Sequence, residues 1–372
     1  MVRLRQTGDK MKKLLLSGAA LLGTTAANAA GLDQSGQSIA LLFKDGGYVE
    51  TSIGLVFPNI GSTSIVLGSN TGNVTHNYFL LGGGFKNDMN PSLSYAVIFD
   101  QPYGVDLLYP TTGSVLVGGT SAVDDTCAVT GLLRYKLSDR FSLHGGARAQ
   151  TLSADVGLSG LAYGGLSGYT AAFASSTAFG YVLGGAFEIP DIALRIALTY
   201  NSEISHDVDT LELGAIAGTT NIVTPQSANL DFQTGIMADT LLFGTVRWVN
   251  WNGFDVTPTF LFGATGSSLV EYTSDYYTTS IGVGRRFSDT WSGAFQLGYE
   301  GAAGGLSSPL SPSDGFWSVG IGGTYTKDNM EITSGLRAGK PGGTVIGVGG
   351  SPLAQMDDGI VYSLGVKVGY SF

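Results

Sequence analysis

Cationic side chains recur at alternate positions of several β-prone segments, and their spacing points to binding rather than catalysis. Successive side chains of a strand point to opposite faces, so alternation places these residues on one shared face. An arginine on that face can hold a carboxylate through two parallel hydrogen bonds, which makes Arg148 and Arg247 candidate lumenal binding residues. A structural network of ion pairs is the favoured interpretation for most of the set, which comprises Arg134, Arg148, Arg195, Arg247, Arg337, Lys367, Glu188, Glu203, Glu300 and Glu331.

Catalytic and metal-binding patterns are absent from the sequence. His76, His144 and His206 lie far apart, without the spacing of zinc ligands. There is no G-x-S-x-G nucleophile motif, and GLRAGKPG at Gly335 lacks the spacing and the Ser/Thr of a P-loop. The sequence therefore predicts neither an enzyme nor a bound metal or cofactor.

The elements that position these residues are predicted to be strands of a transmembrane β-barrel. In WSGAFQLGYE, Trp291, Phe295 and Tyr299 oppose Gln296 and Glu300. Soluble sandwiches also alternate, but aromatic residues at the ends of apolar faces are typical of the interfacial girdles of outer-membrane barrels. One face is therefore expected to contact lipid and the other to line a polar lumen.

Tight polar turns carrying aspartate set the expected strand count. Aspartates at 88, 139, 191, 239, 289 and 328 mark six such turns, and each interval holds two strands and a longer loop. We expect about 14 antiparallel strands, both chain ends on the tight-turn side, and a last strand ending in Tyr370 and Phe372 that pairs with the first. The expected strands are 47–57, 74–86, 92–103, 123–136, 141–156, 177–189, 192–206, 226–237, 240–251, 272–287, 291–300, 315–326, 330–339 and 359–372.

The N-terminus predicts export. From Met11, Lys12 and Lys13 precede a short apolar run, and Ala27-Asn28-Ala29 supplies a cleavage site. We interpret residues 1–29 as an upstream extension plus signal peptide, 30–46 as a short plug, and 47–372 as the barrel. Met1 and Met11 both remain candidate start residues.

Composition supports a membrane barrel and excludes one class of partner. Charged residues make up 13% of the chain, and the formal net charge is −10. Nucleic acid is excluded, because phosphate binding needs clustered Lys and Arg. Cys127 is the single cysteine, so no internal disulfide forms.

An uncharged apolar stretch at 158–179 is expected to form an extracellular loop with a ligand-binding groove. Its candidate residues are Leu158, Leu161, Tyr163, Leu166, Tyr169 and Phe173. A second apolar loop starts at Phe254 and carries Phe260, Leu261 and Phe262. The alternative is that these side chains pack against each other as a lid.

The third predicted strand is irregular, because FDQPYGVDLLYP places Pro102 and Gly104 where it should continue. Pro102 cannot donate to the ladder, and Gly104 would permit backbone angles that a regular strand does not use. Either the strand ends at Asp100, or a kink opens a lateral gate in the wall. Residues of the plug would then occlude or line the gate: Ile39, Leu41, Leu42 and Phe43.

Four segments carry a resemblance to a family: AGLDQSGQSIALLF, FDQPYGVDLLYP, LSGLAYGGLSGY and TPQSANLDFQTGI. They resemble bacterial outer-membrane transporters of the FadL/TodX family, and the resemblance covers essentially all of the mature chain. It implies a 14-stranded barrel, an N-terminal hatch, a kinked third strand and sideways diffusion of ligand into the membrane. The segment 30–46 is shorter than the family's usual hatch and lacks its Asn-Pro-Ala motif.

The expected function is uptake of hydrophobic molecules, such as long-chain fatty acids or hydrocarbons, across the outer membrane by passive diffusion. Expected partners are those ligands, outer-membrane lipid and lipopolysaccharide, and the assembly machinery that reads a terminal aromatic residue. The alternatives are a general porin for hydrophilic solutes and a structural or adhesin barrel.

Overall fold

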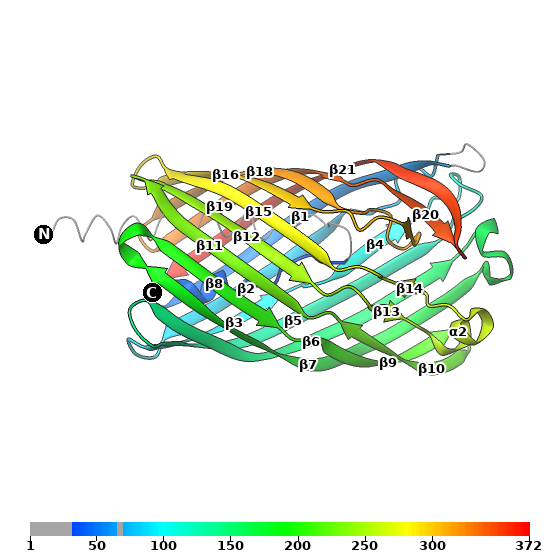
Figure 1. Cartoon of the computed structure of the whole chain (residues 1–372), viewed down its shortest axis with the longest axis horizontal. Helices are drawn as coiled ribbons and strands as arrows, with labels where there is room; N and C mark the ends of the chain where they lie inside the picture. The colour runs from blue at the N-terminus through cyan, green and yellow to red at the C-terminus, as the bar shows by residue number, and fades with distance from the viewer. Residues whose placement is uncertain (1–31, 65–69) are drawn as a thin grey trace, which may run out of the picture.

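The computed structural model describes residues 32–64 and 70–372, which form a closed antiparallel β-barrel (Figure 1). The predicted extension and signal peptide at 1–29 lie outside the described residues. Each wall strand pairs with its neighbours, and the last strand closes on the first from Tyr48↔Ser371 onward. The prediction of 14 wall strands is confirmed. They are β1 (Tyr48–Ser64), β2 (Tyr78–Asp88), β3 (Leu93–Asp100), β5 (Ser121–Lys136), β6 (Phe141–Leu158), β7 (Tyr169–Ile189), β8 (Leu194–Asn201), β11 (Ser227–Met237), β12 (Thr240–Val249), β15 (Tyr276–Arg286), β16 (Trp291–Glu300), β18 (Phe316–Lys327), β19 (Met330–Pro341) and β21 (Ser351–Ser371).

Shorter elements extend the wall strands or lie in the connections between them. They are β4 (Gly104–Leu108), β9 (Ile204–Glu212), β10 (Ile216–Thr224), β13 (Asp255–Val256), β14 (Val270–Glu271), β17 (Leu306–Ser307), β20 (Thr344–Val348), η1 (Ala40–Phe43), η2 (Leu161–Leu166), η3 (Pro190–Ile192) and α2 (Thr259–Thr265). In the described part of the chain, no helix has the length and apolar character needed to cross a membrane.

The six predicted tight turns all connect wall strands at the end of the barrel that holds the C-terminus (Figure 1, left). Asp239 and Asp328 have φ values of 58° and 51° in the turns that join Met237↔Thr240 and Lys327↔Met330. Aspartate tolerates this left-handed conformation, which two-residue hairpins require. At these two turns the aspartate therefore has a conformational role, whereas the other four turn aspartates do not have a positive φ.

Three predicted boundaries at the opposite end are wrong. Strand β7 begins at Tyr169 rather than 177, and β21 begins at Ser351 rather than 359. Residues 207–225, expected as a loop, instead form most of a hairpin in which β9 pairs with β10. The wall is therefore taller on the β6–β10 side than the sequence suggested.

An apolar band covers the outside of the barrel. Along β19, exposed and buried residues alternate at every position, with Ile332 and Leu336 exposed and Thr333 and Arg337 buried. Aromatic side chains such as Tyr181, Trp291 and Tyr362 are also exposed on the outer face. A closed barrel with such a band is the architecture of outer-membrane proteins, so the predicted localisation in the bacterial outer membrane is confirmed.

Closure of the barrel involves the last residue. The amide of Phe372 donates to the carbonyl of Gly47 at 3.0 Å, and its ring stacks on Phe85 with centroids 5.7 Å apart. A Cβ at position 47 would lie 2.4 Å from that ring, so glycine is needed there for close approach. The terminal aromatic residue thus covers the seam between β21, β1 and β2.

Replacing Phe372 with Ala should reduce the yield of assembled barrel, because it removes an aromatic pair worth about 0.5–1.5 kcal/mol at the closing seam. The measurement is the amount of heat-modifiable protein in outer-membrane fractions. Phe179→Ala is the control, since that ring is 76% exposed on the outer face. Equal yields for the two variants would contradict a role for the terminal ring in closure.

Candidate functional site

The third wall strand is interrupted between β3 and β4, and this wall break comprises residues 101–103. Strand β2 pairs with β3 only from Gly83 to Asp88, while β4 pairs with β5. Among the described residues, the only bond that crosses the interval runs from the Leu81 amide to Oε1 of Gln101 at 2.6 Å. Pairing resumes beyond it at the Thr75↔Leu107 bridge. Strand β3 therefore ends at Asp100, and β4 continues the pairing with β5 after the interruption.

The N-terminal segment (residues 32–46) supplies the missing main-chain partner inside the barrel. The Gln34 amide donates to the Pro102 carbonyl at 2.8 Å, and the Gly104 amide donates to the Leu32 carbonyl at 2.9 Å. These bonds flank an antiparallel bridge between Asp33 and Tyr103. The N-terminal segment therefore acts as a short edge strand at the wall break.

The expected reason for Gly104 is wrong. Gly104 does not have a positive φ. A Cβ there would lie 2.6 Å from Nε2 of Gln34 and 3.0 Å from the Asp124 carbonyl. A larger residue would therefore displace the end of the Gln34 side chain and crowd the main chain of β5. Pro102 has no amide hydrogen, and its position lies outside the paired strands.

A buried ion pair fixes the N-terminal segment to the opposite wall. Arg247 on β12 is 4% exposed and binds Asp33 through both carboxylate oxygens, with Nε–Oδ2 2.6 Å and Nη2–Oδ1 3.0 Å. It also donates to Ser227, Asn229 and Gln37. The bidentate carboxylate site anticipated for a lumenal arginine is therefore occupied by the chain's own Asp33.

A second anchor lies at the end of η1. The ring of Phe43 has the guanidinium carbons of Arg134 and Arg195 each 4.5 Å from its centroid. Ile39, Leu41 and Leu42 are buried in the same cluster, which includes wall residues of β3, β5, β7 and β8. The four predicted plug residues thus lie inside the barrel, packed against its wall.

The wall cavity, of about 70 Å³, lies beside the wall break. Its lining combines buried residues of the inner side, such as Leu41 and Lys367, with residues exposed on the outer face, such as Leu81 and Phe99. Gln101 and Ser35 also line it. The cavity therefore extends through part of the wall thickness where the β2–β3 ladder has ended.

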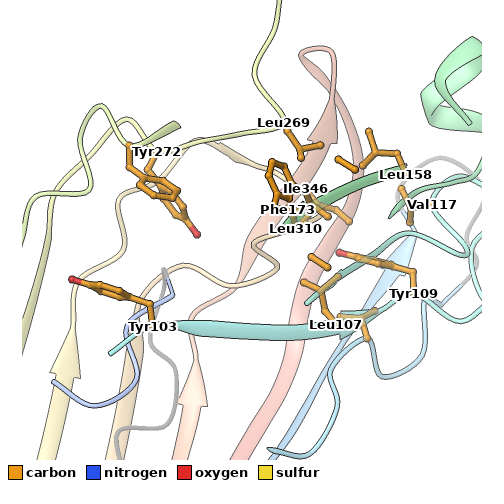
Figure 2. Packing of buried hydrophobic residues seen from close by; sticks show 14 of the residues in the cluster. Tyr103, Leu107, Tyr109, Val117, Leu158, Phe173, Leu269, Tyr272, Leu310 and Ile346 are labelled. Atoms are coloured by element: carbon orange, nitrogen blue, oxygen red, sulfur yellow. The ribbon is translucent and has the colours of Figure 1, made fainter. Parts of the chain in front are cut away.

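The apolar cavity, also about 70 Å³, lies in the half of the lumen farther from the C-terminus. Trp251 is its central aromatic residue, with ring centroids 5.0 Å from Phe254, 5.1 Å from Tyr272 and 5.6 Å from Tyr103. Figure 2 shows Tyr103 and Tyr272 in the hydrophobic cluster to which the cavity belongs. Burial raises the pKa of Tyr272 to about 12, so its hydroxyl stays protonated and donates to Ser311 at 3.1 Å.

The lumen is divided into an apolar and a polar half. Around the apolar cavity, Leu152, Phe173 and Val208 face inward and are buried, while Asp155, Asp207 and Asp209 are exposed on the outer face. Nearer the chain terminus, a polar cavity of about 180 Å³ is lined by residues that include Arg195, Arg247 and Arg337. The expectation of a uniformly polar lumen is therefore wrong for the half with the apolar cavity.

The six predicted groove residues do not form one exposed groove. Tyr169 and Phe173 belong to strand β7, and with Leu158 at the end of β6 they are buried in the lumenal cluster. Tyr163 and Leu166 of η2 are partly buried against that cluster, while Leu161 is 73% exposed. Residues 169–179 of the stretch therefore belong to the wall, the short η2 packs against the lumenal cluster, and of the six residues only Phe173 lines the apolar cavity.

The second apolar loop is divided in the same way. Phe254 and Leu261 are buried, whereas Phe260 and Phe262 are exposed.

Two lumenal predictions have different outcomes. Arg148 is 3% exposed, and its Nε donates to Thr130 at 2.8 Å. Glu203 is exposed, because the interruption between β8 and β9 resets the alternation there.

Sequence reasoning missed Asp33, Tyr103 and Trp251. Tyr103 stands between the two residues that marked the irregular strand, so its position was available as a signal. Asp33 and Trp251 had none, since their roles depend on contacts across the barrel. Among residues 32–64 and 70–372, no group of three His, Cys, Asp or Glu side chains is arranged to hold a metal ion.

Three solved structures with a similar fold align with nearly the whole chain. A FadL homologue from Pseudomonas aeruginosa has a TM-score of 0.73 and 14% identity, over 95% of this chain and 96% of its own. The toluene transporter TodX from Pseudomonas putida has a TM-score of 0.67 and 12% identity, over 95% and 98%. The toluene transporter TbuX from Ralstonia pickettii has a TM-score of 0.63 and 14% identity, over 94% and 98%.

Neither the protein-family models nor the curated proteins contain a match to this chain. At 11–14% identity the solved structures establish the fold alone. The chain has the FadL/TodX fold, as its sequence segments predicted.

Replacing Asp33 with Asn should loosen the N-terminal segment, because breaking a buried ion pair by removing one partner costs about 3–5 kcal/mol. We expect larger and less steady KCl conductance in planar bilayers, as the segment no longer obstructs the lumen. Asp191→Asn makes the same charge change at an exposed turn and should behave as the unaltered protein. Identical conductance for both variants would show that Arg247 does not hold the segment in place.

Proposed function

We propose that this protein is an outer-membrane channel for the uptake of hydrophobic small molecules by passive diffusion. The observation that carries the proposal is an apolar cavity inside the barrel, adjoining the place where the wall ladder is interrupted. Two of the similar solved structures are toluene transporters, which supports the proposal.

The apolar cavity lowers the free energy of a hydrophobic ligand inside the barrel. A hydrophobic molecule gains about 25 cal/mol for each Å² of apolar surface that leaves water, whereas a water-filled pore offers no such gain. Leu152, Val156 and Leu269 provide apolar wall, and only Asp124, Thr126 and Thr224 interrupt a lining otherwise made of apolar and aromatic residues. The cavity is thus a favourable intermediate position for such a ligand.

The exit we propose is lateral, at Pro102 and Gly104. Leu32 lines the apolar cavity and Ser35 lines the wall cavity, so residues 32–35 lie between the two. Displacement of this short stretch would join the cavities and free the wall break. The ligand would then pass between β2 and β3 into the bilayer without crossing the aqueous periplasm.

Two other functions are less well supported. A general porin needs a continuous polar path, but in the described part of the chain an apolar cluster occupies one half of the lumen and the N-terminal segment obstructs the other. A purely structural or adhesin barrel gives no reason for a cavity that extends into the wall at a ladder interruption. Lipopolysaccharide and the barrel-assembly machinery remain proposed partners.

Replacing Ala154 with Phe should fill the apolar cavity and slow hydrocarbon uptake about tenfold, the effect of losing room for two methylene groups at about 0.8 kcal/mol each. The measurement is uptake of labelled toluene or hexane by cells or proteoliposomes. Overpacking costs about 1–3 kcal/mol, so heat-modifiability must first show that the barrel is assembled.

Ala147→Phe is the matched control, because Ala147 lies on the same strand but is exposed on the outer face. Its uptake should be unchanged. Equal uptake by both variants would remove the cavity from the route. Rapid swelling of proteoliposomes in sugars, without hydrocarbon uptake, would replace the proposal with a general porin.

A further inference from the structure

One charged residue lies in the lining of the apolar cavity. Of the 21 residues that line it, Asp124 is the only one with an ionisable acid or base other than tyrosine. Asp124 shares the inward face of β5 with Ala122 and Thr126, and it pairs with Val105 and Ala154, which also line the cavity. Its position is therefore set by the ladder and not by a flexible loop.

The carboxyl group of Asp124 has no hydrogen bond or ion pair within the described residues. The hydroxyl groups of the lining have other acceptors. Tyr103 donates to the Pro225 carbonyl at 3.2 Å, Tyr272 to Ser311 at 3.1 Å, and Thr126 to the Tyr103 carbonyl at 2.7 Å. Thr224 donates to the Ile204 carbonyl. No hydroxyl group of the lining is therefore left for Asp124, and the indole N–H of Trp251 makes no hydrogen bond within the described residues.

Asp124 is partly buried, and a carboxylate that loses hydration in an apolar cavity without gaining a partner is destabilised. A ligand that brings a cation or a hydrogen-bond donor would remove that cost, whereas a ligand carboxylate would add a like charge. The aromatic rings of Trp251, Tyr103, Tyr272 and Phe254 lie in the same lining. Aromatic faces attract cations, most strongly where water is excluded.

We propose that the apolar cavity selects hydrophobic amines, with the ammonium group held by Asp124 among the aromatic rings and the apolar body against Leu152, Val156 and Leu269. This inference rests on the proposed function and names its substrate class. Asp124 is then a specificity-determining residue that disfavours fatty-acid anions in this cavity. A neutral hydrocarbon of the same size still fits, but without the ionic contact.

The test is equilibrium dialysis of hexylamine, hexanol and hexanoate at pH 7 against the full chain in nanodiscs, with binding to empty nanodiscs subtracted. The three probes share their apolar body and differ in their head group. Two variants are compared with the unaltered protein: Asp124→Asn, and Asp125→Asn as the matched control. Asp125 is the next residue on the strand and is exposed on the outer face.

Hexylamine should bind about tenfold more tightly than hexanoate, and Asp124→Asn should weaken hexylamine binding about tenfold while leaving hexanol unchanged. Asp125→Asn should leave all three affinities unchanged. The inference is overturned if hexanoate binds as tightly as hexylamine, or if the two variants behave alike. Binding of hexanol without a preference for the amine refutes this inference alone, whereas no binding of any probe also counts against the proposed function.

Discussion

Inside a bilayer every main-chain amide and carbonyl must find a partner within the protein, because lipid supplies none. The barrel meets this requirement by strand pairing around its circumference, with an interruption between β2 and the third wall strand. There the Gln101 side chain, the Thr126 hydroxyl and the main chain of residues 32–34 take over the missing bonds. The N-terminal segment therefore acts as part of the wall although it lies in the lumen. The interruption of the ladder is tolerated because this segment supplies main-chain hydrogen bonds there.

This arrangement explains how so short a segment can suffice. It does not fill the lumen by volume; it is fixed at two points, by Asp33 on Arg247 and by Phe43 between Arg134 and Arg195. Its residues 32–35 lie between the apolar cavity and the wall cavity. A displacement of only a few residues would change both the lateral opening and the connection between the cavities. In the proposed function, one small movement thus couples ligand passage to opening of the wall.

Much of the barrel could be predicted from sequence because polar residues recur at its tight turns, and at positions 239 and 328 aspartate adopts the left-handed turn conformation that it tolerates better than most residues. The hairpin of β9 and β10 was missed because its pattern is inverted. Asp207 and Asp209 face outward, and Val208 faces an apolar interior. Because apolar residues are expected on the outer face, this pattern predicts a polar loop. Tyr169 and Phe173 were placed in an exposed loop for the same reason. The ion pair of Asp33 with Arg247 joins residues 214 positions apart, and no local pattern encodes such a contact.

The central claim is that a hydrophobic ligand passes from the apolar cavity to the wall break and leaves sideways. The most direct measurement is anomalous diffraction from crystals of the protein soaked with a bromoalkane, which locates the bromine atoms without assumptions about the route. The account predicts bromine in the apolar cavity beside Trp251 and in the wall cavity beside Gln101. Bromine in the polar cavity beside Arg337, with none at the wall break, would contradict it and indicate passage through the lumen toward the periplasm.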